Sequence, residues 1–202
     1  MNKGTAFVVS GPSGSGKDTV LKLVRERMPE LGFSISCVTR PRRGTPAEDG
    51  KYSFISVDEF KSRLEKNMFL EHNIYLGNYY GTPREPVETA IDAGRDIIIE
   101  IDVNGAAQIR RTMPDAVSVF VMPPSMRVLR KRLLGRSTDS PEAAEKRLHE
   151  AVREIGCAKN YDYVIVNDDL DKAVDDMVNI IAAARFRAEN MINFIDEVLE
   201  DA

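Results

Sequence analysis

Short apolar runs alternate with amphipathic segments along most of the chain. Four runs are rich in Val and Ile, namely TAFVVS (5–10), DIIIEIDV (96–103), AVSVFVM (116–122) and YVIVN (163–167). They lack the strict apolar–polar alternation of a half-exposed strand and are typical of strands buried on both faces of a parallel sheet. We therefore predict four strands of one mainly parallel sheet.

Helical segments with readable ends separate these runs. REPVETAIDAG has Pro86 near its start and Gly94 just past its end, and PPSMRVLRKRLLG offers Ser125 as an N-cap and Gly135 as a stop. A further helix is predicted from Ser140 and Pro141, and a long acidic one from about residue 170 to the end. One face of this last helix carries Val174, Met177, Val178, Ile181 and Ala182. Strands alternating with helices predict an α/β fold.

Residues 34–82 break the alternation. This stretch mixes short strands rich in Tyr, Phe and Ile with turns, and it contains one helix after Asp58. We interpret it as a partly antiparallel lobe inserted into the α/β core.

Composition narrows the class of protein. The chain has 202 residues, 43% of them apolar, which suits one core with small appended lobes. No apolar stretch approaches the ~20 residues that span a bilayer, and the N-terminus does not resemble a secretory signal. We expect a cytoplasmic protein in which Cys37 and Cys157 are reduced thiols, because neither lies in a metal-like or CxxC spacing. The net charge of −4 argues against general nucleic-acid binding.

A glycine-rich loop follows the first predicted strand and precedes a helix expected over residues 20–28. The spacing Gly11-x-x-x-x-Gly16-Lys17, in this context, is typical of a phosphate-binding loop. Its glycines let backbone N–H groups surround a polyphosphate, and Lys17 supplies a cation for the β- and γ-phosphates. The predicted ATP-binding residues here are Gly11, Pro12, Ser13, Gly14, Ser15, Gly16, Lys17, Asp18 and Thr19.

Asp18 departs from the usual motif. Ser or Thr normally stands there and ligates Mg²⁺. Thr19 cannot simply replace it, because the next residue of a helix is rotated by ~100°. Asp18 could serve the metal directly or through a water, or it could be only an acid favoured in the first turn of a helix.

The inserted lobe carries groups suited to a second, phosphorylated substrate. Guanidinium groups bind phosphate bidentately and tyrosine hydroxyls can donate to it; the lobe holds Arg40, Arg42, Arg43, Tyr52, Tyr79 and Tyr80. Glu71 lies in the apolar context MFLEHNIYL, where an unpaired carboxylate is costly. The N1–H and N2–H donors of guanine would satisfy it, whereas adenine presents an acceptor at N1.

The sequence resembles the guanylate kinase family nearly end to end. The motifs that carry the resemblance are SGPSGSGKDT, SISCVTRPRR, KYSFISVDEF, FLEHNIYLGNYYGT, IIIEIDVNGA, RKRLLGRSTDS with EKRL, and YVIVNDDLDKA. The resemblance implies a P-loop kinase that phosphorylates GMP or dGMP from ATP with Mg²⁺. It implies a core of residues 1–33, 83–128 and 149–202, a GMP-binding lobe of residues 34–82 and a lid of residues 129–148.

The resemblance also implies roles for individual residues. Ser36, Glu71, Thr82 and Asp102 would read the guanine, and Arg40, Arg43, Tyr52 and Tyr80 would hold the GMP phosphate. Glu100 and Asp102 would organise GMP and metal. Arg132, Arg136 and Arg147 would clamp the transferring phosphoryl group, and Asn167 and Asp168 would border the adenine.

One family glutamate is missing. Pro46 stands where it would align, and either Glu48 or Asp49 could take its place.

We expect catalysis by alignment and electrostatics. The phosphate of GMP is already an anionic nucleophile, so no general base is needed, and His72 and His149 are expected to be structural or exposed. The lobe and a lid over residues 135–141 are expected to close together and exclude water.

Two alternatives stay open. A ribose 1,5-bisphosphate kinase of the same superfamily also tends to carry GKD in its loop, although it needs no guanine reader. A non-catalytic guanylate-kinase-like binding module would have a degraded loop, whereas Gly16, Lys17 and Arg136 are intact. The sequence does not indicate the oligomeric state or a preference between GMP and dGMP.

Overall fold

A five-stranded parallel sheet forms the centre of the protein. The computed structural model describes residues 3–42, 44, 48, 50–135 and 141–201, without the side chains of 141–143. The strand order is β2-β7-β1-β8-β9, and every neighbouring pair is parallel. The strands are β1 (Ala6–Ser10), β2 (Gly32–Phe33), β7 (Ile97–Glu100), β8 (Val117–Met122) and β9 (Tyr163–Val166). This confirms the predicted α/β fold; only the two-residue β2 had no sequence signal.

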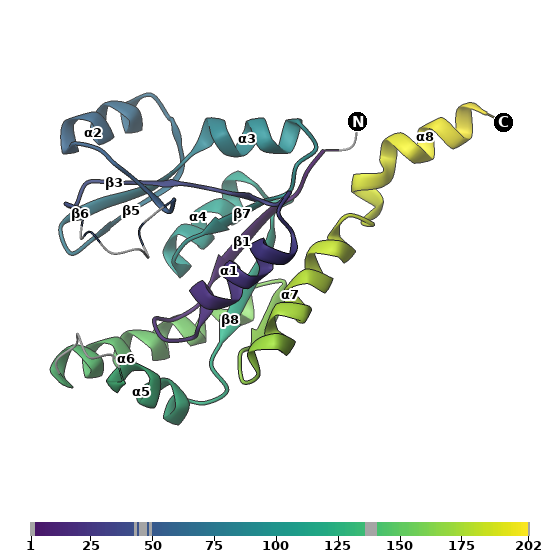
Figure 1. Ribbon diagram of the computed structural model, residues 1–202. Helices are drawn as coiled ribbons and strands as arrows, with labels where there is room; N and C mark the ends of the chain where they lie inside the picture. Colours follow the sequence, from purple (N-terminus) through teal and green to yellow (C-terminus); the bar gives the residue numbers. More distant parts are fainter. Residues whose placement is uncertain (1–2, 43, 45–47, 49, 136–140, 202) are drawn as a thin grey trace.

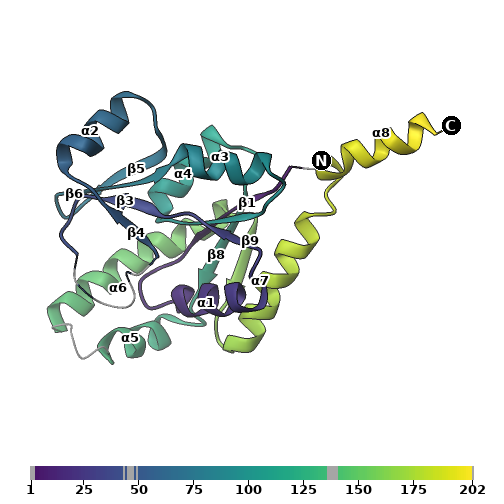
Figure 2. The same cartoon turned by 45° about the horizontal axis from the view of Figure 1, so that its top comes forward.

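Helices cover both faces of this sheet (Figures 1 and 2). Successive strand residues point to opposite faces, so Phe7 and Val9 pack against α1 (Lys17–Arg27) and α7 (Leu170–Ala184). Val8 belongs to the second core, with residues of α3 (Arg84–Asp92) and α4 (Val103–Thr112). Burial on both sides explains why the strands read as continuous apolar runs.

A second, smaller sheet lies beside the first and has the order β4-β3-β6-β5. Its strands are β3 (Ser36–Val38), β4 (Tyr52–Phe54), β5 (Phe69–Tyr75) and β6 (Asn78–Pro83). The pair β3–β4 is parallel and the others are antiparallel. Helix α2 (Val57–Glu65) covers it, with Phe60 stacked on Phe69 at 4.4 Å between ring centroids. We call this part, residues 34–82, the inserted lobe.

Helices α5 (Met126–Leu134) and α6 (Pro141–Gly156) pack on each other at one side of the central sheet (Figure 1). Leu129 and Leu133 of α5 meet Ala144 and Leu148 of α6. The Val128 N–H donates to the Ser125 hydroxyl at 3.2 Å, as the N-cap prediction requires. The predicted start at Ser140 lies outside the described residues.

The prediction of one long C-terminal helix was wrong. Helix α7 ends at Ala184, a short 3₁₀ turn (Ala188–Met191) follows, and a separate helix α8 (Ile192–Glu200) runs away from the body (Figures 1 and 2). Ala184 is the last residue of α7 buried against the sheet. The side chain of Asn190 then donates to the Ala184 carbonyl at 2.7 Å and to the Thr5 hydroxyl at 3.3 Å, which fixes the break.

Three other element boundaries differ from the sequence prediction. Helix α1 begins at Lys17 rather than at residue 20, and α2 begins at Val57, one residue before Asp58. The predicted strand over residues 96–103 is shorter than expected, because β7 stops at Glu100 and α4 begins at Val103.

Two chemical expectations can be compared with the structure. Cys37 and Cys157 are both free. Among the described residues, no helix is both long enough and apolar enough to span a membrane.

Candidate active site

The carboxyl ends of β1, β7 and β9 meet at one edge of the central sheet, where α/β proteins bind ligands. The glycine-rich loop leaves β1, Glu100 ends β7 and Asn167 follows β9. Groups far apart in sequence are thereby placed together.

The loop needs glycine at specific points. Gly14 and Gly16 have φ values of 88° and 89°, a region that other residues rarely adopt. A Cβ at Gly16 would lie 2.2 Å from the side-chain nitrogen of Asn167, and one at Gly11 would lie 2.3 Å from the Val121 carbonyl oxygen. Tight packing, and not only flexibility, therefore fixes these residue types.

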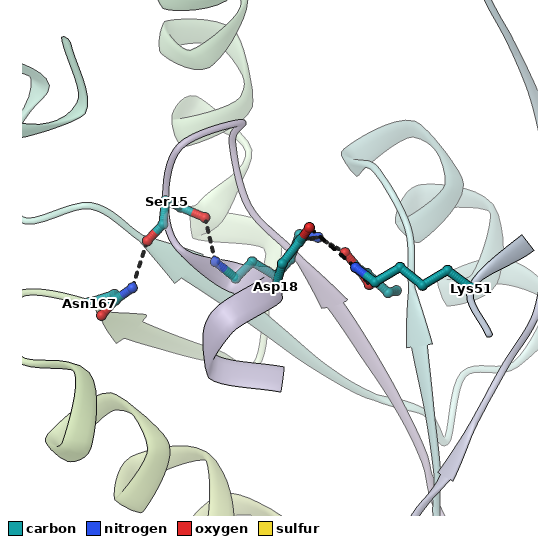
Figure 3. Close-up of polar contacts among 6 residues, drawn as sticks. Ser15, Asp18, Lys51 and Asn167 are labelled. Atoms are coloured by element: carbon teal, nitrogen blue, oxygen red, sulfur yellow. Dashed lines mark hydrogen bonds and ion pairs between the residues drawn. The ribbon is translucent and has the colours of Figure 1, made fainter. Parts of the chain in front are cut away.

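The far side of the loop is anchored by Asn167 and Arg132. Asn167 Nδ2 donates to the Ser15 carbonyl at 2.8 Å, as Figure 3 shows. Arg132, from α5, donates to the same carbonyl at 3.2 Å and to the Asn167 carbonyl at 3.0 Å. Of the remaining predicted ATP-site residues, Pro12 is buried, whereas Ser13, Thr19 and Asp168 are exposed.

Two further arginines, Arg136 and Arg147, are predicted at the phosphate site. Arg147 is half-buried on α6, and Arg136 lies outside the described residues.

Two lysines and two carboxylates form an ion-pair network beside the loop. Lys17 Nζ contacts Asp18 Oδ1 at 3.3 Å and forms an ion pair with Glu100 Oε1. Lys51 Nζ, from the inserted lobe, contacts Asp18 Oδ2 at 3.2 Å and Glu100 Oε2 at 3.1 Å. Each lysine therefore meets one oxygen of each carboxylate.

These contacts fix the charge states of the network. Burial disfavours the charged form of Lys17, but Glu100 and Asp18 outweigh it, so the pKa of Lys17 lies above its ordinary value. Burial would raise the pKa of Asp18, but Lys17 and Lys51 dominate and hold this pKa well below its ordinary value. Lys17 and Asp18 are therefore both charged at neutral pH.

Glu71 lies in a different environment, inside the inserted lobe. Glu71 is only 5% exposed, and its carboxylate accepts a hydrogen bond of 2.7 Å from the Thr82 hydroxyl. Burial raises the pKa of Glu71 to about 7; Thr82 lowers it and the charge of Asp102 adds to the rise. A Cβ at Gly105 of α4 would lie 2.6 Å from Glu71 Oε2, so a glycine is needed where the carboxylate approaches the helix.

Strand β5, which carries Glu71, is fastened to α4. Gln108 accepts from the His72 N–H at 3.2 Å and donates to the His72 carbonyl at 2.8 Å. Asp102 is the N-cap of α4, accepting from the Gly105 N–H at 2.8 Å, and it also accepts from Asn73 Nδ2 at 2.7 Å. The carboxylate predicted at the end of a strand thus begins a helix instead.

The predicted phosphate-binding groups of the lobe surround Arg40. This residue is buried, forms an ion pair with Glu48, and has its guanidinium 5.2 Å from the Tyr52 ring centroid. The rings of Tyr52 and Tyr80 meet edge to face at 6.4 Å. Of the two candidates to replace the missing glutamate, Glu48 lies against Arg40, and Asp49 lies outside the described residues, as do Arg43 and Pro46.

Ser36 begins β3 of the same sheet, and its N–H donates to the Lys51 carbonyl at 3.1 Å. The histidines are peripheral, since His72 is half-buried and His149 is exposed.

Sequence reasoning did not find Lys51, Asn73, Gly105 or Gln108. Their partners lie between 3 and 49 residues away along the chain. Of these contacts, only the hydrogen bond from the Gly105 N–H to Asp102 belongs to a local sequence pattern, the helix N-cap.

Comparison with known proteins gives matches over nearly the whole chain. The family model described as guanylate kinase matches residues 3–184. A guanylate kinase of Neisseria gonorrhoeae is 43% identical over 99% of this chain and 98% of its own length. One of Symbiobacterium thermophilum is 47% identical over 98% of this chain and 94% of its own length. The crystal structure of guanylate kinase from Anaplasma phagocytophilum superimposes with a TM-score of 0.77 at 31% identity, covering 94% of this chain and 90% of that one.

Proposed function

Because the chain belongs to the guanylate kinase family of enzymes, we propose that it transfers the γ-phosphoryl group of ATP to GMP, giving ADP and GDP. The observation that best supports this proposal is Glu71, a buried carboxylate hydrogen-bonded to Thr82 in a lobe beside the phosphate-binding loop.

Glu71 and Thr82 suit the Watson–Crick edge of guanine. An ionised carboxylate only accepts hydrogen bonds, and guanine offers the adjacent donors N1–H and N2–H. The hydroxyls of Thr82 and Ser36 could donate to the guanine O6, and Asp102 would complete the reader. Adenine would leave Glu71 facing an acceptor, and a mispaired buried group can cost ~10⁴-fold in discrimination.

The GMP phosphate would bind where the lobe gathers positive charge. Arg40, held by Glu48 and by the aromatic rings, is already oriented, so little entropy is lost when it meets an anion. Tyr52 and Tyr80 lie beside it and would donate from their hydroxyls, and Arg43 would be the second guanidinium.

ATP would bind with its phosphates in the glycine-rich loop and its adenine toward Asn167 and Asp168. The positive end of α1 and the loop N–H groups would hold the phosphates. Lys17 would leave its carboxylate partners for the β- and γ-phosphates. The in-line transfer would need no general base, because the GMP phosphate is itself the nucleophile.

Arginines of the lid region would offset the charge that spreads over the transferring group. We assign this role to Arg132, Arg136 and Arg147. Hydrogen bonds to the Ser15 and Asn167 carbonyls support this role for Arg132, because they hold it beside the glycine-rich loop. Closure of the inserted lobe (34–82) and the lid (129–148) over both substrates would exclude water.

Magnesium fits the residues present. Mg²⁺ in kinases takes one or two carboxylates together with phosphate oxygens and water. Asp18 and Glu100 each present an oxygen that now meets Lys17, and these oxygens become available if Lys17 moves to the phosphates. When bound, the ion would neutralise phosphate charge.

The other two candidate functions receive less support. A ribose 1,5-bisphosphate kinase would have no donor pair for the buried Glu71 carboxylate. A non-catalytic binding module would not need the intact loop or its anchors Asn167 and Arg132.

Replacing Glu71 with Gln tests the proposal. The amide removes the negative charge and turns one acceptor into a donor, so we expect kcat/KM for GMP to fall about 100-fold, the loss of about one charge-assisted hydrogen bond. The KM for ATP should stay the same. Steady-state ADP release measures both, and Glu65→Gln at the exposed end of α2 is the matched control. Unchanged GMP kinetics in Glu71→Gln would reject the guanine assignment.

A further inference from the structure

We propose that Lys51 is a positioning residue that balances the extra charge of Asp18 and ties the inserted lobe to the phosphate-binding loop. This inference rests on the proposed function, since it concerns how that site accepts ATP. Neither the loop motif nor the lobe motifs assign Lys51 a role.

The first support is the geometry of the ion pairs. Lys51 Nζ lies 3.2 Å from Asp18 Oδ2 and 3.1 Å from Glu100 Oε2, and the Lys51 side chain is only 21% exposed (Figure 3). Lys17 takes the other oxygen of each carboxylate. Lys51 can therefore keep both carboxylates in place after Lys17 has turned to the phosphates.

The second support is the charge at the site. Ser or Thr is neutral at the position of Asp18 in the usual motif. Asp18, whose side chain is 66% exposed, adds a negative charge beside the place where a triphosphate must bind, and like charges repel each other there, most of all at low salt. Lys51 supplies one positive charge within ion-pair distance of that aspartate, so the net charge matches that of a neutral residue at position 18.

The third support is the place of Lys51 in the lobe. Lys51 directly precedes Tyr52 of β4, and its carbonyl accepts from the Ser36 N–H at 3.1 Å. Holding the Lys51 ammonium at α1 therefore holds the starts of β3 and β4, where GMP contacts are proposed. Coupling between two equilibria is reciprocal. If the Lys51 ion pairs hold the lobe in a position that favours ATP binding, bound ATP will in turn stabilise the lobe in that position.

A double-mutant cycle tests this inference. The variants are Lys51→Met, Asp18→Asn and their combination, with Lys61→Met on the exposed face of α2 as the control for loss of a lobe lysine. Calorimetry with a non-hydrolysable ATP analogue, without Mg²⁺ and at low salt, gives a dissociation constant for each protein. Thermal melting checks that each variant is folded.

We expect Lys51→Met to weaken analogue binding about tenfold in the original protein but by no more than about threefold when Asp18→Asn is already present, a coupling of at least about threefold. Lys51→Arg should retain most of the affinity, and Lys61→Met should change little. An equal loss from Lys51→Met with and without Asp18→Asn would overturn the inference.

The two proposals fail separately. Turnover of GMP by the unmodified protein tests the proposed function, whereas the cycle is read from binding without turnover. Coupling without GMP turnover would support the inference about Lys51 and Asp18 and would reject the proposed function. Turnover without coupling would reject only the pair.

Discussion

At the scale of single residues, two kinds of carboxylate occupy the site. Asp18 and Glu100 lie between two lysines, each of which contacts both carboxylates. Glu71 is buried beside a hydroxyl, and its pKa rises to about 7. The first pair is suited to cations, and Glu71 is suited to a neutral partner that presents two N–H donors.

This raised pKa predicts that GMP binding depends on pH. The ionised form of Glu71 is lost as the pH falls through about 7, so the carboxylate can no longer accept both guanine donors. We expect the dissociation constant for GMP to rise about tenfold per pH unit below that point. The phosphate of GMP also titrates near pH 6, so calorimetry should compare the original protein with Glu71→Gln. A pH profile that is the same in both proteins would contradict the assignment.

At the scale of elements, helix α4 and strand β5 are built as a unit. The Gln108 side chain forms two hydrogen bonds with the His72 backbone. Asp102 caps the helix and accepts a hydrogen bond from Asn73, and the missing side chain of Gly105 leaves room for Glu71. The position of the Glu71 carboxylate is therefore set by the core as much as by its own lobe.

A methyl group at Gly105 should disturb this unit. The Cβ would lie 2.6 Å from Glu71 Oε2, so we expect Gly105→Ala to displace the carboxylate and weaken GMP binding at least about tenfold, the equivalent of about 1.4 kcal/mol of overpacking. Binding of an ATP analogue should be unaffected. Gly156→Ala, where a Cβ meets nothing within 4 Å, is the matched control. Normal GMP affinity in Gly105→Ala would show that Glu71 is not held as described.

At the scale of the whole molecule, the central sheet and the helices on its two faces contain the two large hydrophobic cores. Both large core clusters include residues of β1, one on each face. Helix α8 stands apart from this body, with no buried residue and with Phe194, Ile195 and Leu199 exposed (Figure 1).

Removal of residues 194–202 should therefore cost little stability. No side chain of α8 is buried, and the anchoring residue Asn190 is retained. We expect the melting temperature to change by less than about 2 °C, with GMP turnover unchanged. Thermal unfolding followed by circular dichroism measures the effect. A fall of several degrees, or one that depends on protein concentration, would show that α8 packs against something in solution.

The sequence predicted the fold class well because burial on both faces leaves continuous apolar runs such as 5–10 and 116–122. It failed at the C-terminus, where the apolar stripe continues past Ala184 although the sheet that it packs on has ended. It also missed α4, whose cap Asp102 follows the strand so closely that the two elements read as one apolar run.

The candidate site divides in the same way. Local motifs identified the loop, Arg40 and Glu71, whose residue types are unusual in their immediate context. Lys51 and Gln108 have ordinary local contexts and become significant only through partners that folding brings to them. Gly105 is likewise explained only by the side chain opposite it.

The most direct measurement is the rate of ADP release with ATP and Mg²⁺ across GMP, AMP, UMP and ribose 1,5-bisphosphate. The account predicts rapid turnover with GMP and at least about 1,000-fold lower kcat/KM with AMP and UMP, since a buried carboxylate that meets the wrong edge stays unpaired. Ribose 1,5-bisphosphate should give no rate above that of ATP alone. A preference for the sugar bisphosphate, or equal rates with AMP and GMP, would contradict it.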